Sequence, residues 1–104
     1  MKTQNQAECR RLEERKPVSL PAQVASQGVK CLAQMQDISR SGCRLLVNRR
    51  FEVGTDIEVT LTNGIKRSGI VRRCLPIDGS RKFEVGLEVI DRSWPESLLP
   101  PDDE

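Results

Sequence analysis

Three arginines near the N-terminus have the side-chain type and spacing to bind an anion. Arg11 and Arg15 are four positions apart, and Arg10 stands immediately before them. A guanidinium offers a planar fork of donors that matches phosphate oxygens or the O6/N7 edge of guanine, and it can also stack on a base. Arginines at this spacing also occur on ordinary solvated surfaces, where Glu13 and Glu14 would pair with them at little energetic gain.

A second polar cluster, Asp37–Gly42, falls in a connection between two expected strands. The Asp37 carboxylate can accept hydrogen bonds from N1–H and N2–H₂ of guanine, and the Ser39 hydroxyl can donate or accept. Gly42 has no side chain, so the backbone could approach a ligand closely there. The same residue types are also common in simple turns, because Asp and Ser bond to neighbouring backbone groups.

Together the two clusters suit a guanine nucleotide that carries several phosphates. The arginines would supply the cationic side of such a site, and Asp37 and Ser39 would bind the base. The sequence contains neither a GxxxxGK(S/T) loop nor a GxGxxG fingerprint, so it does not resemble the common nucleotide-hydrolysing or dinucleotide-binding folds.

Residue types that catalysis and metal binding favour are scarce. Histidine is absent, which excludes a Ser-His-Asp triad within this chain. The cysteines are widely spaced and form no CxxC pair, so we expect reduced thiols, no metal site and no cofactor; they are Cys9, Cys31, Cys43 and Cys74. We therefore expect a binding protein and not an enzyme.

Length and charge limit the protein further. A chain of 104 residues has room for one domain, and its formal net charge is only +2. That value averages a net +6 over residues 1–90 and a net −4 over the acidic residues 91–104. No apolar run approaches the roughly 20 residues of a membrane span. No apolar block follows Met1-Lys2, so we expect a cytoplasmic location.

Hydrophobic periodicity predicts an all-β domain. Residues 1–16 are polar and basic, and we expect a flexible arm that carries the Arg-x-x-x-Arg pair. Alternating or short apolar segments separated by turn residues then predict six strands, at 18–24, 29–36, 43–47, 56–61, 65–75 and 83–89. The Asn63-Gly64 pair is a strong hairpin signal.

Six short strands with short turns favour a small six-stranded antiparallel β-barrel, because closure removes exposed strand edges. We expect it to span residues 17–92. Residues 93–104 should form a short capping segment, with one helical turn, and an acidic tail. Trp94 would pack against one mouth of the barrel or, less readily, offer a surface to a ligand.

The two polar clusters, in this order, resemble the signature of the PilZ domain family. Arg11-x-x-x-Arg15 is followed by Asp37-x-Ser39-x-x-Gly42, and Val85-Gly86-Leu87 is similar to a late strand of the family. The resemblance spans about residues 9–92. It implies a six-stranded barrel that serves as a bacterial receptor for cyclic di-GMP, with no catalysis of its own.

The resemblance also implies roles for individual residues. Arg11 and Arg15 would hold phosphates and outer guanine edges, Asp37 and Ser39 would bind a guanine, and Gly42 would shape the loop. The position of Arg10 influences, in the family, whether one cyclic di-GMP or a stacked pair binds, and a cation there favours the pair. Binding would order the arm and create a surface that a downstream partner protein reads.

Two other functions remain open from the sequence. A PilZ-type adaptor could act through protein contacts without binding nucleotide. A small RNA-binding barrel could use the paired basic residues, although such proteins usually stack bases on exposed aromatic side chains. The chain has two Phe, one Trp and no Tyr, so we do not expect nucleic acid as the partner.

Overall fold

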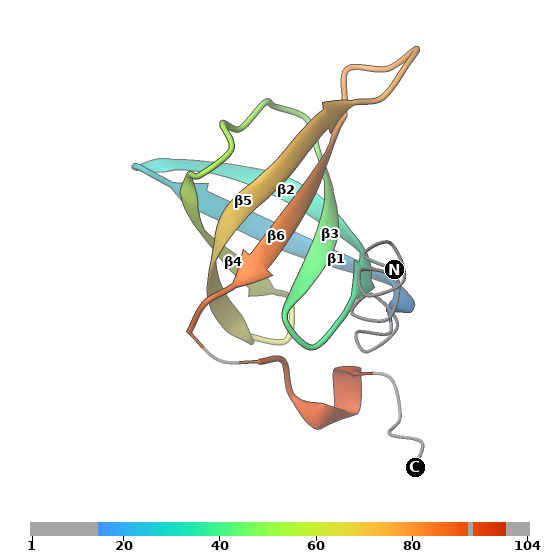
Figure 1. Cartoon of the computed structure of the whole chain (residues 1–104), viewed down its shortest axis with the longest axis vertical. Helices are drawn as coiled ribbons and strands as arrows, with labels where there is room; N and C mark the ends of the chain where they lie inside the picture. The colour runs from blue at the N-terminus through green and yellow to red at the C-terminus, as the bar shows by residue number, and fades with distance from the viewer. Residues whose placement is uncertain (1–14, 92, 100–104) are drawn as a thin grey trace, which may run out of the picture.

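Six antiparallel strands close into a barrel in the computed structural model, which describes residues 15–91 and 93–99 (Figure 1). The strand order around the barrel is β1-β2-β3-β6-β5-β4, so β4 pairs with β1 and β6 lies between β3 and β5. The strands are β1 Lys16–Ser26, β2 Val29–Ile38, β3 Gly42–Val47, β4 Asp56–Leu61, β5 Lys66–Pro76 and β6 Phe83–Val89. The predicted all-β barrel is therefore confirmed.

The strand boundaries differ from the sequence prediction mainly at strand ends. β1 begins at Lys16 instead of Val18, and β5 begins at Lys66 instead of Ile65. The largest difference concerns the polar stretch at Asp37–Gly42: its first two residues belong to β2 and Gly42 opens β3. Polar side chains such as Lys16, Ser26 and Asp37 gave no apolar signal at these ends, because the ladder hydrogen bonds are made by backbone groups.

The core is formed by the inward-facing residues of the strands. In β4 and β6 it follows the period of two that the sequence showed, with Ile57, Val59 and Leu61 buried in β4 and Val85 and Leu87 in β6. Leu45, Val59, Val71 and Val85 are each completely inaccessible to solvent. Burying apolar side chains at about 25 cal/mol per Å² is the main stabilising contribution to such a small barrel.

The register shifts at three β-bulges, one between Pro17 and Leu20 of β1 and one each in β2 and β5. In β2, Met35 pairs with Leu45 and Asp37 pairs with Arg44, so Gln36 is an extra residue. In β5, Val71 pairs with Leu87 and Arg73 pairs with Gly86, so Arg72 is an extra residue. A bulge inserts one residue and re-aims the side chains that follow it.

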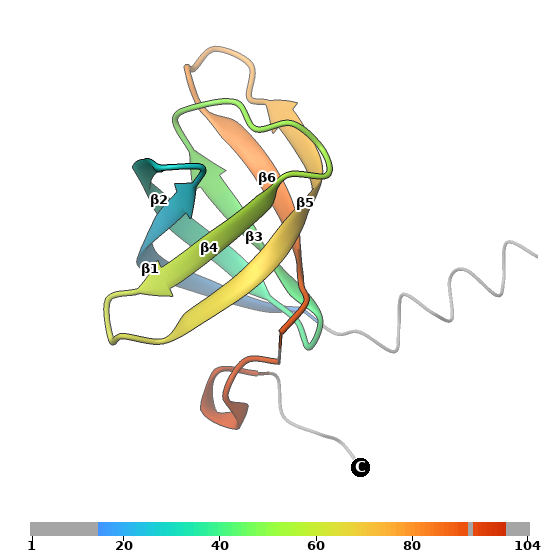
Figure 2. The same ribbon diagram turned by 90° about the vertical axis from the view of Figure 1, so that its left-hand side faces the viewer.

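An aromatic side chain packs at each end of the barrel. The 48–55 connection runs over the end where β3 finishes and β4 begins, and it buries Phe51 (Figure 2). At the opposite end lies the C-terminal segment, which buries Trp94 and continues into a short 3₁₀ turn, η1 Glu96–Leu98 (Figures 1 and 2). No helix among the described residues is long and apolar enough to cross a membrane.

The C-terminal segment is attached to the barrel through Trp94 and Arg67. Arg67 of β5 is buried, its guanidinium lies 5.8 Å from the centre of the Trp94 ring, and its Nε donates to the Ser93 carbonyl at 3.0 Å. The Trp94 indole Nε1 donates to the Gly42 carbonyl at 3.2 Å. With 2% of its surface exposed, Trp94 is a packing residue, as the sequence favoured.

Gly42 is required by the contact between β3 and β6. A Cβ at this position would lie 2.1 Å from the Leu87 carbonyl oxygen, which no real side chain tolerates. We expect Gly42→Ala to lower the free energy of unfolding by about 2–3 kcal/mol, because the two strands must separate to admit the methyl group. Urea unfolding measures this loss.

Gly86→Ala is the matched control, since it adds the same methyl group to β6, which pairs with β3, the strand of Gly42. A Cβ there would meet no atom closer than 3.5 Å, so we expect a change within about 0.5 kcal/mol. Equal losses in the two variants would contradict the steric explanation.

Candidate functional site

Asp37 is held between two arginines. The bulge at Gln36 places Asp37 opposite Arg44 in the β2–β3 ladder, and its Oδ2 lies 2.8 Å from Arg44 Nη2. Its other oxygen, Oδ1, accepts a hydrogen bond from Arg15 Nη1 at 2.7 Å. The Asp37 side chain is only 8% exposed, so both ion pairs operate in a partly desolvated setting where they are stronger than at an open surface.

The start of β1 brings Arg15 to this carboxylate. Lys16 pairs with Ile38 and Pro17 with Asp37, so the residue before β1 necessarily lies beside the end of β2. Arg15 remains about half exposed and can therefore also reach a ligand. The other two arginines of the predicted site, Arg10 and Arg11, lie outside the described residues.

The β2–β3 turn contains the remaining predicted residues. Ser39 is buried, its backbone N–H donates to the Gly42 carbonyl at 2.9 Å, and its hydroxyl lies 3.5 Å from the same oxygen. The structure assigns Gly42 a packing role against Leu87. Because the Trp94 indole also donates to the Gly42 carbonyl, this one oxygen joins the turn to the C-terminal segment.

A shallow depression of about 380 Å³ brings several of these residues together on the outer surface of β3, β5 and β6. It is lined by Arg15, Ser39, Ser41, Gly42, Arg72, Arg73, Gly86, Leu87 and Glu88. Asp37 does not line it, because Arg15 and Arg44 cover the carboxylate. The structure thus groups Arg15, Ser39 and Gly42 around the depression and places Asp37 directly behind Arg15.

Charge distinguishes this depression from two others of similar volume. A depression of about 430 Å³ beside the β1–β2 turn is lined by two carboxylates, Asp56 and Glu58, and by no cation. Another of about 400 Å³ over β1, β2 and β3 has one cation, Lys82, at its rim. Three arginines surround the 380 Å³ depression, which makes it the best suited of the three to an anionic ligand.

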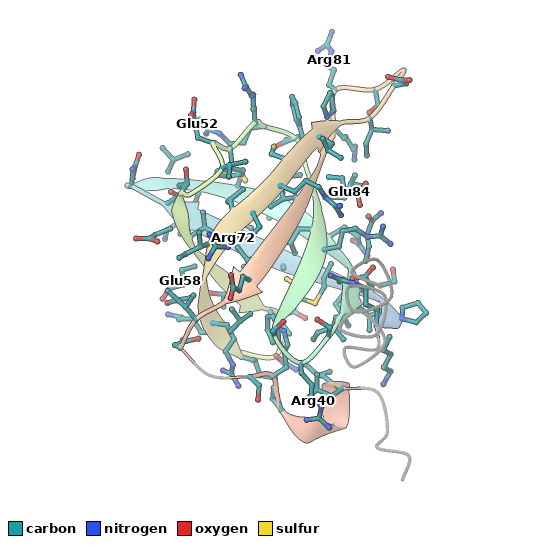
Figure 3. The ribbon with its side chains drawn as sticks, in the orientation of Figure 1. Arg40, Glu52, Glu58, Arg72, Arg81 and Glu84 are labelled. Atoms are coloured by element: carbon teal, nitrogen blue, oxygen red, sulfur yellow. The ribbon has the colours of Figure 1, made fainter. Side chains whose placement is uncertain are left out.

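Sequence reasoning missed the outward-facing charges of β3, β5 and β6. Arg44 bridges Asp37 and Glu84, with 3.0 Å between its Nη1 and Glu84 Oε2. Arg72 pairs with Glu88 at 2.6 Å, and Figure 3 shows Arg72 on the outer surface over β5 and β6. Arg44 could have been found, because it alternates with Cys43 and Leu45, which face the core.

Arg44 also has an unsatisfied donor. Among the described residues, its Nε is a buried side-chain nitrogen without a hydrogen-bond partner. An unmade hydrogen bond of a charged group is costly, so the pairs with Asp37 and Glu84 must offset that cost. The guanidinium is thus held by its two carboxylate partners.

The described cysteines are free thiols, namely Cys31, Cys43 and Cys74. Burial and the neighbouring Asp37 carboxylate raise the pKa of the Cys43 thiol to about 12, with a smaller opposing effect from Arg15. Burial also raises the pKa of Cys31, against the effect of Arg49. Raised pKa values keep these thiols protonated and poorly nucleophilic.

In the described part of the chain, Cys, Asp and Glu form no cluster of three or more that could hold a metal ion.

The chain matches a known protein family. The family model described as "PilZ domain" matches residues 10–95, which is most of the chain. The match includes both polar clusters and all six strands. Among curated proteins, no sequence matches significantly.

The contribution of the Arg44–Asp37 pair can be measured with a double-mutant cycle. We expect Arg44→Met to lower the free energy of unfolding by about 1–3 kcal/mol, since it leaves Asp37 with one partner. The loss should shrink in an Asp37→Asn background, because the amide carries no charge to be compensated.

Arg72→Met is the control for this cycle. Its partner Glu88 is 47% exposed, so removing the pair should cost less than about 1 kcal/mol. Purely additive effects of Arg44→Met and Asp37→Asn would show that the pair does not contribute.

The raised pKa of the Cys43 thiol predicts that the free energy of unfolding depends on pH. Its pKa in the folded protein is about 12 against an ordinary value of 9.0, so folding favours the protonated form. The stabilisation that the protonated thiol gives to the folded protein is complete below pH 9.0 and is lost as the pH rises toward 12. Over that range, wild type should lose unfolding free energy more steeply than Cys43→Ala, as measured by urea unfolding. Parallel pH profiles would contradict the prediction.

Proposed function

Because the chain belongs to the PilZ domain family, we propose that it is a receptor for cyclic di-GMP. PilZ domains generally bind this dinucleotide and serve as binding and adaptor domains, not as enzymes. The observation that carries the proposal is the Arg15–Asp37 ion pair at the edge of a depression rimmed by cations. It holds together the two signature residues whose chemistry fits a guanine and a phosphate.

Binding would proceed by exchange of partners. Arg15 donates a hydrogen bond to Asp37. A phosphate of cyclic di-GMP can replace the carboxylate as the partner of Arg15. The N1–H and N2–H₂ groups of a guanine base can then replace Arg15 as donors to Asp37. Arg44 stays on the second Asp37 oxygen and keeps the carboxylate oriented. Each charge-assisted hydrogen bond gained contributes about 1.5–3 kcal/mol.

Residues ahead of β1 would complete the site. Arg10 and Arg11 precede Arg15 by a few positions, so they could place two more guanidiniums against the ligand phosphates. Fixing that segment costs about 1–2 kcal/mol per residue, which several charge-assisted bonds offset. A cation at Arg10 favours a stacked pair of ligands, whose combined charge is about −4. The rearranged segment would form the surface that a partner protein recognises.

The aromatic residues argue against the RNA-binding alternative. All three aromatic side chains are described, and Phe51 and Trp94 are buried while Phe83 packs against the core. None of them offers the exposed ring on which single-stranded RNA would stack. An adaptor that works without nucleotide remains the outcome to which a failed binding experiment would point.

Calorimetric titration with cyclic di-GMP tests the proposal. We expect binding by wild type and a weakening of about 10- to 150-fold in both Arg15→Ala and Asp37→Ala, as the loss of one charge-assisted bond implies. A stoichiometry of two ligands per protomer is expected from Arg10. One ligand per protomer would contradict the stacked pair but not the receptor function.

Two controls accompany the titration. Arg81→Ala removes one positive charge from the β5–β6 loop and should leave the affinity unchanged. Cyclic di-AMP lacks the two guanine donors that Asp37 would bind, so it should not bind measurably. Absence of heat with cyclic di-GMP and wild type would refute the receptor function. Equal affinity of wild type, Arg15→Ala and Asp37→Ala would show that the binding site lies elsewhere on the protein.

A further inference from the structure

A row of four paired residues crosses the outer surface of the barrel. Asp37 of β2 pairs with Arg44 of β3, Arg44 pairs with Gly86 of β6, and Gly86 pairs with Arg73 of β5. Side chains at directly paired positions lie side by side on one surface of a sheet. Gly86 therefore separates two guanidiniums, with the Asp37 carboxylate at the end of the row.

The Arg73 side chain packs over the outer surface of Gly86. A Cβ on Gly86 would lie 3.5 Å from Arg73 Cβ, 3.8 Å from its Nε and 4.0 Å from its Nη2. Because two guanidinium nitrogens are nearly equidistant from that point, the Arg73 side chain folds back over Gly86 instead of extending into solvent. The side chain is still 55% exposed, so a large part of it faces outward.

Glu84 holds the two guanidiniums of the row. Its Oε2 lies 3.0 Å from Arg44 Nη1 and 3.9 Å from Arg73 Nη2. Glu84 is paired with both Leu46 and Leu75, two positions along the strands from the row, so its side chain is on the same surface as the row. The shorter contact is a charge-assisted hydrogen bond to Arg44, and at 3.9 Å the same carboxylate attracts the Arg73 guanidinium without a hydrogen bond to it.

The same depression that Arg15 and Ser39 line includes Arg73 and Gly86. A ligand that engages Arg15 and Asp37 therefore meets Arg73 across the depression. A guanidinium that rests on a glycine and exposes its other surface is a suitable support for a planar base, which it attracts by stacking and by a cation–π interaction.

We propose that Arg73 is a ligand-contacting residue that stacks on a guanine base of bound cyclic di-GMP, with Gly86 as the floor beneath it. This inference rests on the proposed receptor function. It assigns to β5 and β6 a part of the site that lies outside both polar clusters of the sequence. Asp37 binds the edge of a base, and Arg73 binds its flat surface.

Titration of cyclic di-GMP into Arg73 variants separates stacking from simple charge attraction. Arg73→Ala should weaken binding by about tenfold, within the range found when a stacking side chain is removed. Arg73→Lys keeps the charge without the planar group and should resemble Arg73→Ala. Arg73→Tyr loses the charge but offers a ring for the base, and it should stay within about threefold of wild type.

The control is Arg81→Ala, which removes the same charge far from the row, near the tip of the β5–β6 loop (Figure 3). It should bind as wild type does. Each variant should unfold at the wild-type temperature, since Arg73 is largely exposed.

The outcomes distinguish the two proposals. If wild type does not bind cyclic di-GMP, the receptor function is refuted and the role of Arg73 with it. If wild type binds and Arg73→Ala binds equally well, only the role of Arg73 is refuted. If Arg73→Lys matches wild type while Arg73→Tyr matches Arg73→Ala, the contact is one of charge and stacking is refuted.

Discussion

The extra residue in β2 is the constraint on which the site depends. Met35 and Ile38 are both completely buried although they are three positions apart, and a regular strand would place them on opposite sides. The bulge at Gln36 resolves this by turning Asp37 outward, opposite Arg44. Without it, either an apolar core residue would face solvent or the Asp37 carboxylate would enter the core unpaired, at a cost of several kcal/mol.

Ion pairs then connect residues that the chain keeps far apart. Asp37 binds Arg15 and Arg44, Arg44 also binds Glu84, and Arg73 lies within reach of the same Glu84 oxygen. An anionic ligand entering the depression would compete with carboxylates for these arginines, so the proposed binding would be an exchange of partners with a modest net change in charge burial. The Gly42 carbonyl joins the same turn to Trp94, which gives the C-terminal segment a direct contact with the site.

The difference between predicted and observed features has a consistent physical origin. Core positions in β4 and β6 followed from alternation, because burial selects apolar side chains at every second residue. Alternation could place Arg44 and Glu84 on the outside of their strands, but it gave them and Arg73 no role, since a charged residue there is compatible with any function or none. At Gly42 the missing side chain admits the Leu87 carbonyl, a contact between distant parts of the chain that the sequence could not indicate.

The sequence by itself determined the strand count, the barrel, the turns and the two polar clusters that indicate the family. These features depend on local periodicity and on residues close together in the chain, which a reader of the sequence can see. Only the tertiary structure decided that Arg15 and Arg44 both pair with Asp37, and that Arg73 lies over Gly86. Those contacts depend on strand register and on the bulges in β1, β2 and β5, and register is fixed by the packing of the whole core.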